Sequence, residues 1–438
     1  MKQMKDSGIE WIEQIPEDWT TKRIKELFTE INDRCEYGGN YTLLSVSEYY
    51  GVAPRADKVP EDEMITHADS LDGYKICLPN DIVMNIMLAW KRALGVSNFT
   101  GIVSPAYCVY RSKIDMIARY FHYLFRTDIY ANLFKQYSTG IIDSRLRLYP
   151  DKFLSLTCHF PNKETQKRIA DFLDEKCDKI DRYIEKQQQV IEKLKAYKQS
   201  VITEAVTKGI NPDVPMKDSG IEWIGMIPEH WGVAKLANLF TFLGGYAFNS
   251  DLYVPETENL IVRIGNVKND RLLFDANPVY ISDDLSEQVI KFKLQCGDIL
   301  FTMTGTKGKR DYFYTLILDD SHIQTKNLYL NQRVGCFRKK AHIHAEYYNY
   351  LLKDNRILDS IFLYETGTAN QGNLGIDSIN RTKVHLPPYD EQIIIANYLK
   401  DKCSRIDAVI AKKEVAINKS TEYKKSLIYE AVTGKLEV

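Results

Sequence analysis

Two segments of the chain carry a hydrophobic pattern that is typical of long helices. In residues 164–208, apolar side chains recur at intervals of three and four, so they form one narrow stripe along a helix. The stripe consists of Ile169, Leu173, Cys177, Ile180, Ile184, Ile191, Leu194, Val201 and Ala205, with Gln187 and Lys198 as polar members. In residues 391–435 the same stripe contains Ile395, Leu399, Cys403, Ile406, Ile410, Ile417, Leu427 and Ala431, interrupted by Lys413, Ser420 and Lys424.

A stripe this narrow fits one partner helix better than a broad core, so the pattern predicts two coiled-coil helices. The alternative is two amphipathic helices that each pack on their own domain. Neither segment contains Pro or Gly before Gly209 and Gly434, where we expect the C-caps. At 1.5 Å per residue, each helix would be ~65 Å long, and two such helices side by side would form a spacer.

The chain repeats itself. A shift of 226 positions superposes the two helical segments, and MKDSGIEWIEQIPEDW (Met4 to Trp19) returns as MKDSGIEWIGMIPEHW (Met216 to Trp231). Each half therefore has a shared opening, a divergent middle and a shared closing helix. We expect the tryptophans of the openings to pack against the long helices; these are Trp11, Trp19, Trp223 and Trp231.

The two middles, residues 20–160 and 232–386, have the pattern of short strands. Runs of Tyr, Phe, Ile, Val and Thr alternate with Gly, Asn and Asp, as in CLPNDIVMNIMLAW and CGDILFTMTG. Helical periodicity predicts one helix from Met116 to Tyr137 and its counterpart from Ala345 to Phe362. The middles are therefore predicted to be mixed α/β domains.

Composition and charge narrow the class of protein. The chain has 438 residues, of which 44% are hydrophobic and 27% charged, and no apolar run approaches the ~18 residues that span a bilayer. The N-terminus lacks the pattern of a secretory signal, so we expect a cytoplasmic protein. The eight cysteines are scattered singly, which argues against a disulfide framework or a structural zinc site. The net charge of −1 weakens a nucleic-acid hypothesis, but an average can conceal a basic groove.

Motifs for catalysis are weak. GTKGKR (Gly305 to Arg310) lacks the spacing of a P-loop, and LPPYDEQ (Leu386 to Gln392) has Leu386 where a DNA amino-methyltransferase needs a polar acceptor. Pro150-Asp151 with Asp174-Glu175-Lys176 resembles a nuclease pattern, which the second half does not keep. The histidines have no metal-like spacing, so no catalytic or metal site is predicted. An enzyme with an unrecognised site and a coiled-coil scaffold without DNA contact are the two rival interpretations.

Several of these segments together carry a family resemblance. The repeated opening, LQCGDILFTMTGTKGK (Leu294 to Lys309), the stretch from Asn80 to Arg111 and the closing PPYDEQIIIANYL resemble the specificity subunits of Type I restriction-modification systems. The resemblance covers essentially the whole chain, including the order of its repeats. It implies an α+β fold in which two mixed α/β target-recognition domains form a pseudo-twofold tandem repeat, separated by two long antiparallel coiled-coil helices.

The resemblance also implies a domain organisation. Residues 1–160 would form the opening and the first target-recognition domain, and residues 161–210 the first long helix. Residues 211–386 would form the second opening and recognition domain, and residues 387–438 the second long helix.

The function implied by the resemblance is recognition without catalysis. Such a subunit reads a bipartite, gapped site on double-stranded DNA and positions two modification (adenine methyltransferase) subunits and restriction (motor-nuclease) subunits. It carries no cofactor; S-adenosylmethionine, ATP and Mg²⁺ are expected on the partner subunits.

Candidate DNA-binding residues follow from the chemistry of base and phosphate contacts. Amide and basic side chains read base edges, while hydroxyl groups, Lys and backbone N–H groups position phosphates. In the first half the candidates are Asn85, Trp90, Lys91, Arg92, Ser138, Thr139, Gly140, Arg145 and Arg147. In the second half they are Thr304, Gly305, Thr306, Lys307, Lys309, Arg310, Thr366, Thr368, Asn370, Gln371 and Asn373. For each, a solvated surface charge, or a core aromatic in the case of Trp90, is the alternative.

Overall fold

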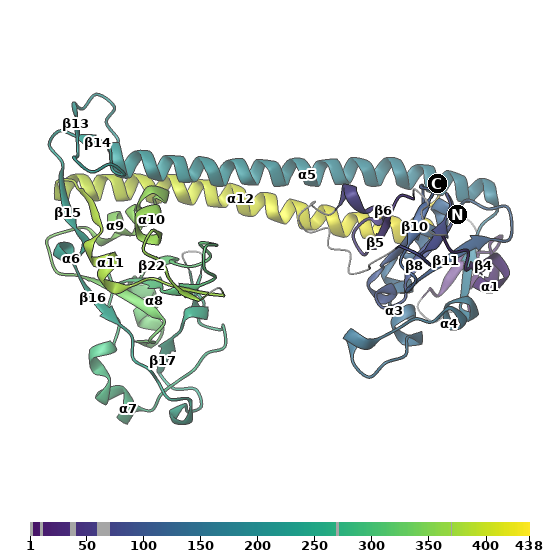
Figure 1. The fold of residues 1–438 in the computed structure, drawn as a ribbon, viewed down its shortest axis with the longest axis horizontal. Helices are drawn as coiled ribbons and strands as arrows, with labels where there is room; N and C mark the ends of the chain where they lie inside the picture. The colour runs from purple at the N-terminus through teal and green to yellow at the C-terminus, as the bar shows by residue number, and fades with distance from the viewer. Residues whose placement is uncertain (1–2, 9–11, 36–40, 59–70, 269–270, 369) are drawn as a thin grey trace. The chain divides into compact units, whose positions relative to one another are not determined.

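The computed structural model describes residues 3–8, 12–35, 41–58, 71–268, 271–368 and 370–438. The chain divides into two compact units, one made of residues 1–188 and 413–438 and the other of residues 189–412. Each unit contains an opening, a mixed α/β domain and part of both long helices (Figure 1). The boundary between the two units passes through both long helices. The expected domain organisation instead treated each long helix as a separate segment.

The core of unit 1 is an antiparallel sheet of four strands in the order β4-β11-β8-β9. Its strands are β4 (Phe28–Ile31), β8 (Ile82–Asn85), β9 (Leu94–Val96) and β11 (Tyr107–Ser112). Two-stranded pairs surround it: β1 (Met4–Asp6) with β2 (Gln14–Pro16), β3 (Thr20–Arg23) with β12 (Thr157–Phe160), β5 (Leu44–Ser47) with β6 (Gly51–Pro54), and β7 (Lys75–Cys77) with β10 (Gly101–Val103). The helices are α1 (Ile24–Leu27), α2 (Ala118–Phe125), α3 (Asp128–Tyr137), α4 (Pro150–Ser155) and the first part of α5 (Lys163–Lys208).

Unit 2 repeats this plan with the sheet order β16-β24-β20-β22. These strands are β16 (Phe240–Gly244), β20 (Ile299–Thr302), β22 (Thr315–Ile317) and β24 (Val334–Lys339). The pairs are β13 (Met216–Asp218) with β14 (Met226–Pro228), β15 (Gly232–Lys235) with β27 (Lys383–Leu386), β17 (Asn259–Val262) in parallel with β23 (Asn327–Leu330), and β18 (Val267–Lys268) with β19 (Arg271–Leu272). A three-stranded sheet combines β21 (Thr304–Gly305), β26 (Gln371–Asn373) and β25 (Thr366–Thr368). The helices are α6 (Leu236–Leu239), α7 (Asp283–Gln288), α8 (Asp320–Thr325), α9 (Ala345–Leu351), α10 (Asn355–Phe362), α11 (Ile376–Arg381) and α12 (Tyr389–Val432).

The two long helices follow the predicted stripe. Every predicted member in α5, from Ile169 to Ala205, is buried or half-buried. The polar members of the stripes form hydrogen bonds and ion pairs between the helices. In unit 1, Lys424 Nζ lies 2.6 Å from Asp181 Oδ2 and Lys413 Nζ donates to Gln187 Oε1 at 2.9 Å. These pairs run in opposite directions along the two helices, so the antiparallel coiled-coil prediction is confirmed.

The long helices end where the sequence predicted. Gly209 and Gly434 have φ of 75° and 74°, a left-handed conformation that glycine adopts without strain. A Cβ at Gly434 would lie 2.4 Å from Pro16 in the opening segment, so this C-cap also requires the absence of a side chain.

The repeated tryptophans of the openings behave as expected where they are described. Trp19 and Trp231 are buried, at 3% and 1% exposure, and each belongs to a core cluster that includes residues of a long helix. Trp223 is half-buried and packs against the core cluster of unit 2. Trp11 lies outside the described residues.

The prediction of one continuous helix in each middle is wrong. The first segment breaks into α2 and α3 because the Thr127 side chain accepts a hydrogen bond from the Tyr130 N–H and caps a new helix. The second segment breaks into α9 and α10, where Asp354 caps α10 by accepting from the Arg356 N–H. Periodicity continued across both breaks, which is why it did not reveal them.

Candidate nucleic-acid interface

The two units hold their middle strands by the same buried ion pair. In unit 1, Asp81 Oδ2 accepts from the Leu78 N–H at 2.9 Å and from Arg111 Nη2 at 2.8 Å. In unit 2, Asp298 Oδ2 accepts from the Gln295 N–H at 2.8 Å and from Arg338 Nη2 at 2.6 Å. Both carboxylates are 2% exposed.

The residue before each carboxylate has a positive φ in both units, at Asn80 and Gly297, so the chain enters strands β8 and β20 through the same tight turn. The loops that leave the far ends of β8 and β20 therefore start from equivalent positions in the two units.

The loop after β8 is shaped by two of the candidate residues. Asn85 is 5% exposed, and its Oδ1 accepts from the Met87 N–H at 3.1 Å. Trp90 lies in the 3-10 helix Ala89–Lys91 and donates from Nε1 to the Met87 carbonyl at 3.1 Å. Lys91 Nζ and Lys135 Nζ lie 5.2 and 4.9 Å from the Trp90 ring centroid, within cation–π range. Asn85 and Trp90 thus hold the loop, while Lys91 is exposed on it.

Arg92 closes the same loop. Its φ of 67° is left-handed, its guanidinium pairs with Asp128 at the start of α3, and its carbonyl accepts from Arg126 Nη1 at 2.8 Å. The side chain remains 37% exposed. Arg92 therefore ties the loop to α3 while keeping a cationic surface.

A second loop of unit 1 contains the other first-half candidates. Ser138 ends α3 and donates from Oγ to the Phe134 carbonyl at 2.6 Å. The backbones of Thr139 and Arg147 exchange two hydrogen bonds of 2.9 and 3.0 Å, which closes the loop. A Cβ at Gly140 would lie 2.6 Å from the Arg145 carbonyl oxygen. Only glycine therefore lets the two strands of the loop come this close.

Both loops of unit 1 meet at a backbone hydrogen bond. The Leu148 N–H donates to the Ile86 carbonyl at 2.9 Å, and Lys135 on α3 reaches the Trp90 ring from the second loop's side. The structure therefore brings together the two groups of first-half candidates. We call residues 86–92 and 137–148 loop face 1.

The second-half candidates also converge. Strand β21, which contains Thr304 and Gly305, pairs with β26, and β26 pairs with β25 in a hairpin. The Leu374 N–H donates to the Met303 carbonyl at 3.2 Å, which matches the Leu148 to Ile86 bond of unit 1. We call residues 303–310 and 365–374, without the undescribed residue 369, loop face 2.

The hairpin of loop face 2 presents hydroxyl and amide groups. Thr366, Thr368, Asn370 and Gln371 are exposed, and Asn373 is half-buried. A Cβ at Gly367, whose φ is 120°, would lie 2.0 Å from the Gln371 carbonyl oxygen. Glycine is thus required at this position of the hairpin.

The basic loop of face 2 rests on a carboxylate that the sequence did not single out. Glu365 accepts from the Gly308 N–H at 3.0 Å and from the Tyr312 hydroxyl at 2.6 Å. Burial, together with the Glu365 carboxylate, raises the pKa of Tyr312, so its hydroxyl remains a donor. Lys307 Nζ donates to the Gly367 carbonyl at 3.2 Å and joins the loop to the hairpin.

The remaining groups of this loop are fixed differently. Hydrogen bonds from the Thr306 hydroxyl and N–H lower the pKa of Asp311, which stays an anion that orders the turn. Arg310 pairs with Asp359 of α10, and its guanidinium carbon lies 5.8 Å from the Phe362 ring centroid. Lys309 is exposed and forms no ion pair with any described residue, and the same holds for Arg145 on loop face 1.

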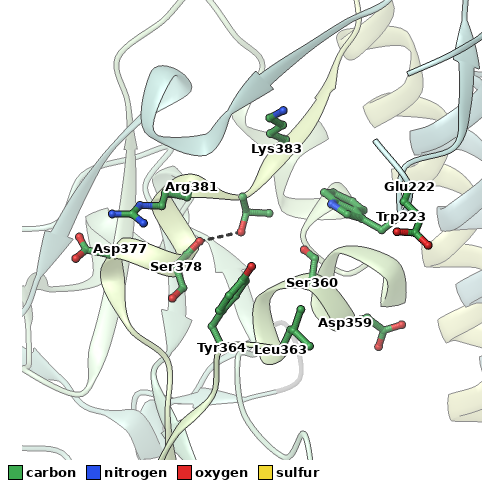
Figure 2. A pocket seen from close by; sticks show the side chains of 11 residues that line it. Glu222, Trp223, Asp359, Ser360, Leu363, Tyr364, Asp377, Ser378, Arg381 and Lys383 are labelled. Atoms are coloured by element: carbon green, nitrogen blue, oxygen red, sulfur yellow. Dashed lines mark hydrogen bonds between the residues drawn. The ribbon is translucent and has the colours of Figure 1, made fainter. Parts of the chain in front are cut away.

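Unit 2 contains a cavity of about 750 Å³ (Figure 2). Trp223 of the opening, the end of α10 and α11 line it, and one of its residues is Asp359, the partner of Arg310. Leu363 and Tyr364 in its wall are 77% and 59% exposed.

Within the described ranges, no group of three or more His, Cys, Asp or Glu side chains is arranged to hold a metal ion. Nor does any helix in those ranges have the length and apolarity to cross a membrane.

Comparison with known proteins agrees with this architecture. Residues 228–419 match the family described as the Type I restriction modification DNA specificity domain. The chain is 25% identical over 446 residues to the Type I restriction enzyme MjaVIII specificity subunit of Methanocaldococcus jannaschii, covering 97% of this chain and 94% of the relative. It is 21% identical over 365 residues to the EcoKI specificity subunit of Escherichia coli K12, covering 82% and 75%.

Solved structures share the fold. A chain from a structure of the assembly and conformational transition of the type I R-M system superposes with a TM-score of 0.70 at 12% identity, covering 96% of this chain and 99% of the other. The HsdS subunit of Thermoanaerobacter tengcongensis gives a TM-score of 0.50 at 13% identity, with 96% and 98% coverage. The predicted α+β class with two long helices is thereby confirmed. Residues 228–419 thus match a Type I restriction modification DNA specificity domain, and the chain resembles a Type I specificity subunit over 97% of its length.

Proposed function

We propose that each loop face reads one half of a bipartite, gapped site on double-stranded DNA. The observation that carries this proposal is the convergence of the candidate residues: in each unit, two loops distant in sequence meet at one backbone hydrogen bond and present basic and hydroxyl or amide groups. The frame beneath them is equivalent in the two units, whereas the side chains on top differ. This is the arrangement that two readers of unlike half-sites require.

The chemistry of the faces suits the proposed roles. Asn and Gln amides match the donor and acceptor pair of adenine in the major groove, and Arg matches guanine. In loop face 2, Asn370 and Gln371 would contact bases, while Lys307 and Lys309 would neutralise phosphates. In loop face 1, Arg145 and Arg147 would contact bases, while Lys91 would neutralise a phosphate.

The long helices would set the gap between the half-sites. Helices α5 and α12 are 46 and 44 residues long, which corresponds to ~65 Å at the α-helical rise. A rigid antiparallel pair would make the unspecific gap constant, with half-site centres about one DNA turn (~34 Å) or a little more apart.

The subunit would act with partners in the cytoplasm, where its DNA lies. Two modification subunits would bind equivalent surfaces of the repeated chain and would bring S-adenosylmethionine, and restriction subunits would bring ATP and Mg²⁺. The chain would contribute recognition and positioning.

The salt dependence of DNA binding tests the proposal. The complex of this chain with its modification subunits is compared with the K307A/K309A variant by fluorescence anisotropy on duplex DNA. If both lysines contact phosphates, the variant should bind specific and random duplexes more weakly, with the slope of log K against log salt reduced by roughly 2. The matched control, K291A/K293A, removes two lysines outside both loop faces and should leave the slope unchanged.

Two results would decide against the proposal. Equal slopes for wild type and K307A/K309A would remove loop face 2 from the interface. Methylation or cleavage of DNA by the chain alone, with S-adenosylmethionine and Mg²⁺ supplied, would support the rival interpretation as an enzyme.

A further inference from the structure

Loop face 1 ends in an apolar tip. Ile141 is 99% exposed and the next residue, Ile142, is 53% exposed. Single exposed apolar residues are common on protein surfaces, so exposure by itself assigns no role. What distinguishes Ile141 is the way in which the loop holds it.

The tip is held by contacts on both sides. The Thr139 and Arg147 backbones exchange two hydrogen bonds below it, and the Arg145 N–H donates to the Ile142 carbonyl at 2.8 Å beyond it. Lys135 Nζ, at 2.9 Å from Asp143 Oδ2, ties the loop to α3. An isoleucine side chain is stiff at χ1, so Ile141 would lose little conformational entropy on making a contact.

The surroundings of the tip indicate the kind of partner. Arg145 is exposed and forms no ion pair with a described residue, and loop face 1 also carries Arg147 and Lys91. An apolar tip on a face that also carries cationic side chains fits a surface that is polyanionic at its rim and has an apolar group in its floor. The major groove of DNA is such a surface, because phosphates border it and thymine places a C5-methyl group in it.

We propose that Ile141 is a specificity-determining residue that packs against a thymine methyl group in the half-site read by unit 1. This inference rests on the proposed function and adds an apolar contact to its polar ones. The described part of the corresponding hairpin in loop face 2 instead exposes the amides of Asn370 and Gln371, which suit adenine. The two faces would then differ in the type of contact as well as in sequence.

The test combines a protein substitution with removal of one methyl group from DNA. The methylated motif of the complex is first determined, and duplexes are made in which each thymine of the motif, one at a time, is replaced by deoxyuridine. Binding is measured for wild type, I141A and the control I114A, which truncates an exposed isoleucine of unit 1 outside loop face 1. Thermal unfolding checks that both variants remain folded.

At one thymine of one half-site, deoxyuridine should weaken wild-type and I114A binding roughly fourfold, the effect of one buried methyl group. I141A should bind the thymine and deoxyuridine duplexes equally at that position. If every deoxyuridine substitution affects wild type and I141A alike, the inference is overturned while the bipartite motif still supports the proposed function. If wild type shows no sequence-selective binding, the proposed function fails, and this inference fails with it.

Discussion

Units 1 and 2 agree closely in their frames and differ in their loop faces. In unit 1 the Tyr120 hydroxyl donates to the Val432 carbonyl at 3.0 Å, and in unit 2 the Tyr347 hydroxyl donates to the Val206 carbonyl at 3.0 Å. Each unit thus packs on the end of the long helix that is encoded by the other half of the gene. The comparison shows that the repeated sequence specifies a common scaffold on which the two loop faces differ.

The frames also differ at one matched pair. In unit 1, Thr21 lies opposite His159 on the neighbouring strand, and the Thr21 hydroxyl and His159 Nδ1 are 2.7 Å apart. In unit 2, Val233 lies opposite His385, whose two ring nitrogens have no hydrogen-bond partner among the described residues. The scaffold therefore tolerates the loss of one interior hydrogen bond, which gives a way to measure its value.

The largest predicted effect concerns the exchanged helix ends. Val432 and Val206 are 1% and 0% exposed, so V432D and V206D would each bury an unpaired carboxylate and cost more than about 4 kcal/mol of unfolding free energy. Hydrogen exchange followed by mass spectrometry should show that V432D opens unit 1 and V206D opens unit 2. The controls V190D and V415D change exposed helix positions and should open neither unit. If V432D opened unit 2 instead, this packing of the helix ends would be contradicted.

The next effect concerns the buried ion pairs beneath the loop faces. Removing either carboxylate breaks the ion pair of its arginine and leaves one backbone N–H without a partner, while Arg338 keeps its hydrogen bond to the Lys293 carbonyl. D81A and D298A should therefore each cost about 3 kcal/mol, the first in unit 1 and the second in unit 2. Urea unfolding measures the loss. D81N and D298N, which keep an acceptor oxygen, should lose less. Markedly unequal losses for the two alanine variants would show that the two ion pairs do not have equal roles.

Acid should weaken both units through matched histidines. Burial lowers the pKa of His159 and of His385 to about 4, below the ordinary value of 6.5 that applies in the unfolded chain. Folding favours the neutral form of each histidine. The contribution of the neutral histidine to the free energy of unfolding is therefore complete above pH 6.5 and is lost as the pH falls toward 4. Between pH 7.5 and 5 each of these two histidines should cost its unit about 2 kcal/mol. Burial also lowers the pKa of His122 in unit 1 to about 3, so unit 1 should lose more than unit 2.

The variant H385L removes one of these groups. Urea unfolding across this pH range should then show a smaller acid loss in unit 2 and an unchanged loss in unit 1. An acid loss in unit 2 that persists in H385L would assign it to other groups.

The smallest effect tests the matched threonine and valine. V233T supplies a hydroxyl opposite His385 and should stabilise unit 2 by about 1 kcal/mol, whereas T21V should destabilise unit 1 by a similar amount. Thermal unfolding of both variants measures these changes in stability. The control is V109T, which adds a hydroxyl at a buried strand position that offers it no partner. Stabilisation by V109T equal to that by V233T would show that the hydroxyl–histidine bond is not the cause.

Local periodicity predicted the long helices, their stripe and their glycine caps, because each of these depends on residues within a few positions of one another. The breaks at Thr127 and Asp354 were missed because a capping side chain interrupts a helix without changing the apolar pattern. The residue types of each candidate loop were enough to predict it as a DNA-binding segment by itself. Their convergence was not predictable, since strands β21 and β26 pair across more than 60 residues and no local signal encodes that contact.

Glu365 and Ile141 differ in how well the sequence alone could have indicated their roles. Glu365 stands beside the threonine and glycine residues of the hairpin, but nothing in its neighbourhood indicates that it supports Gly308 and Tyr312. Ile141 and Ile142 were not among the candidate residues, although two consecutive apolar residues in a polar loop are a local signal that could have marked them.

The central claim is that two loop faces on one chain read two unlike half-sites. It is tested most directly by single-molecule methylome sequencing of a host that expresses this chain with its modification partner. A new methyladenine motif made of two unlike parts separated by a fixed unspecific gap is the predicted result. A symmetric, ungapped motif, or no motif from a complex shown to be folded, would mean that the repeat serves assembly and that the loop faces do not read DNA.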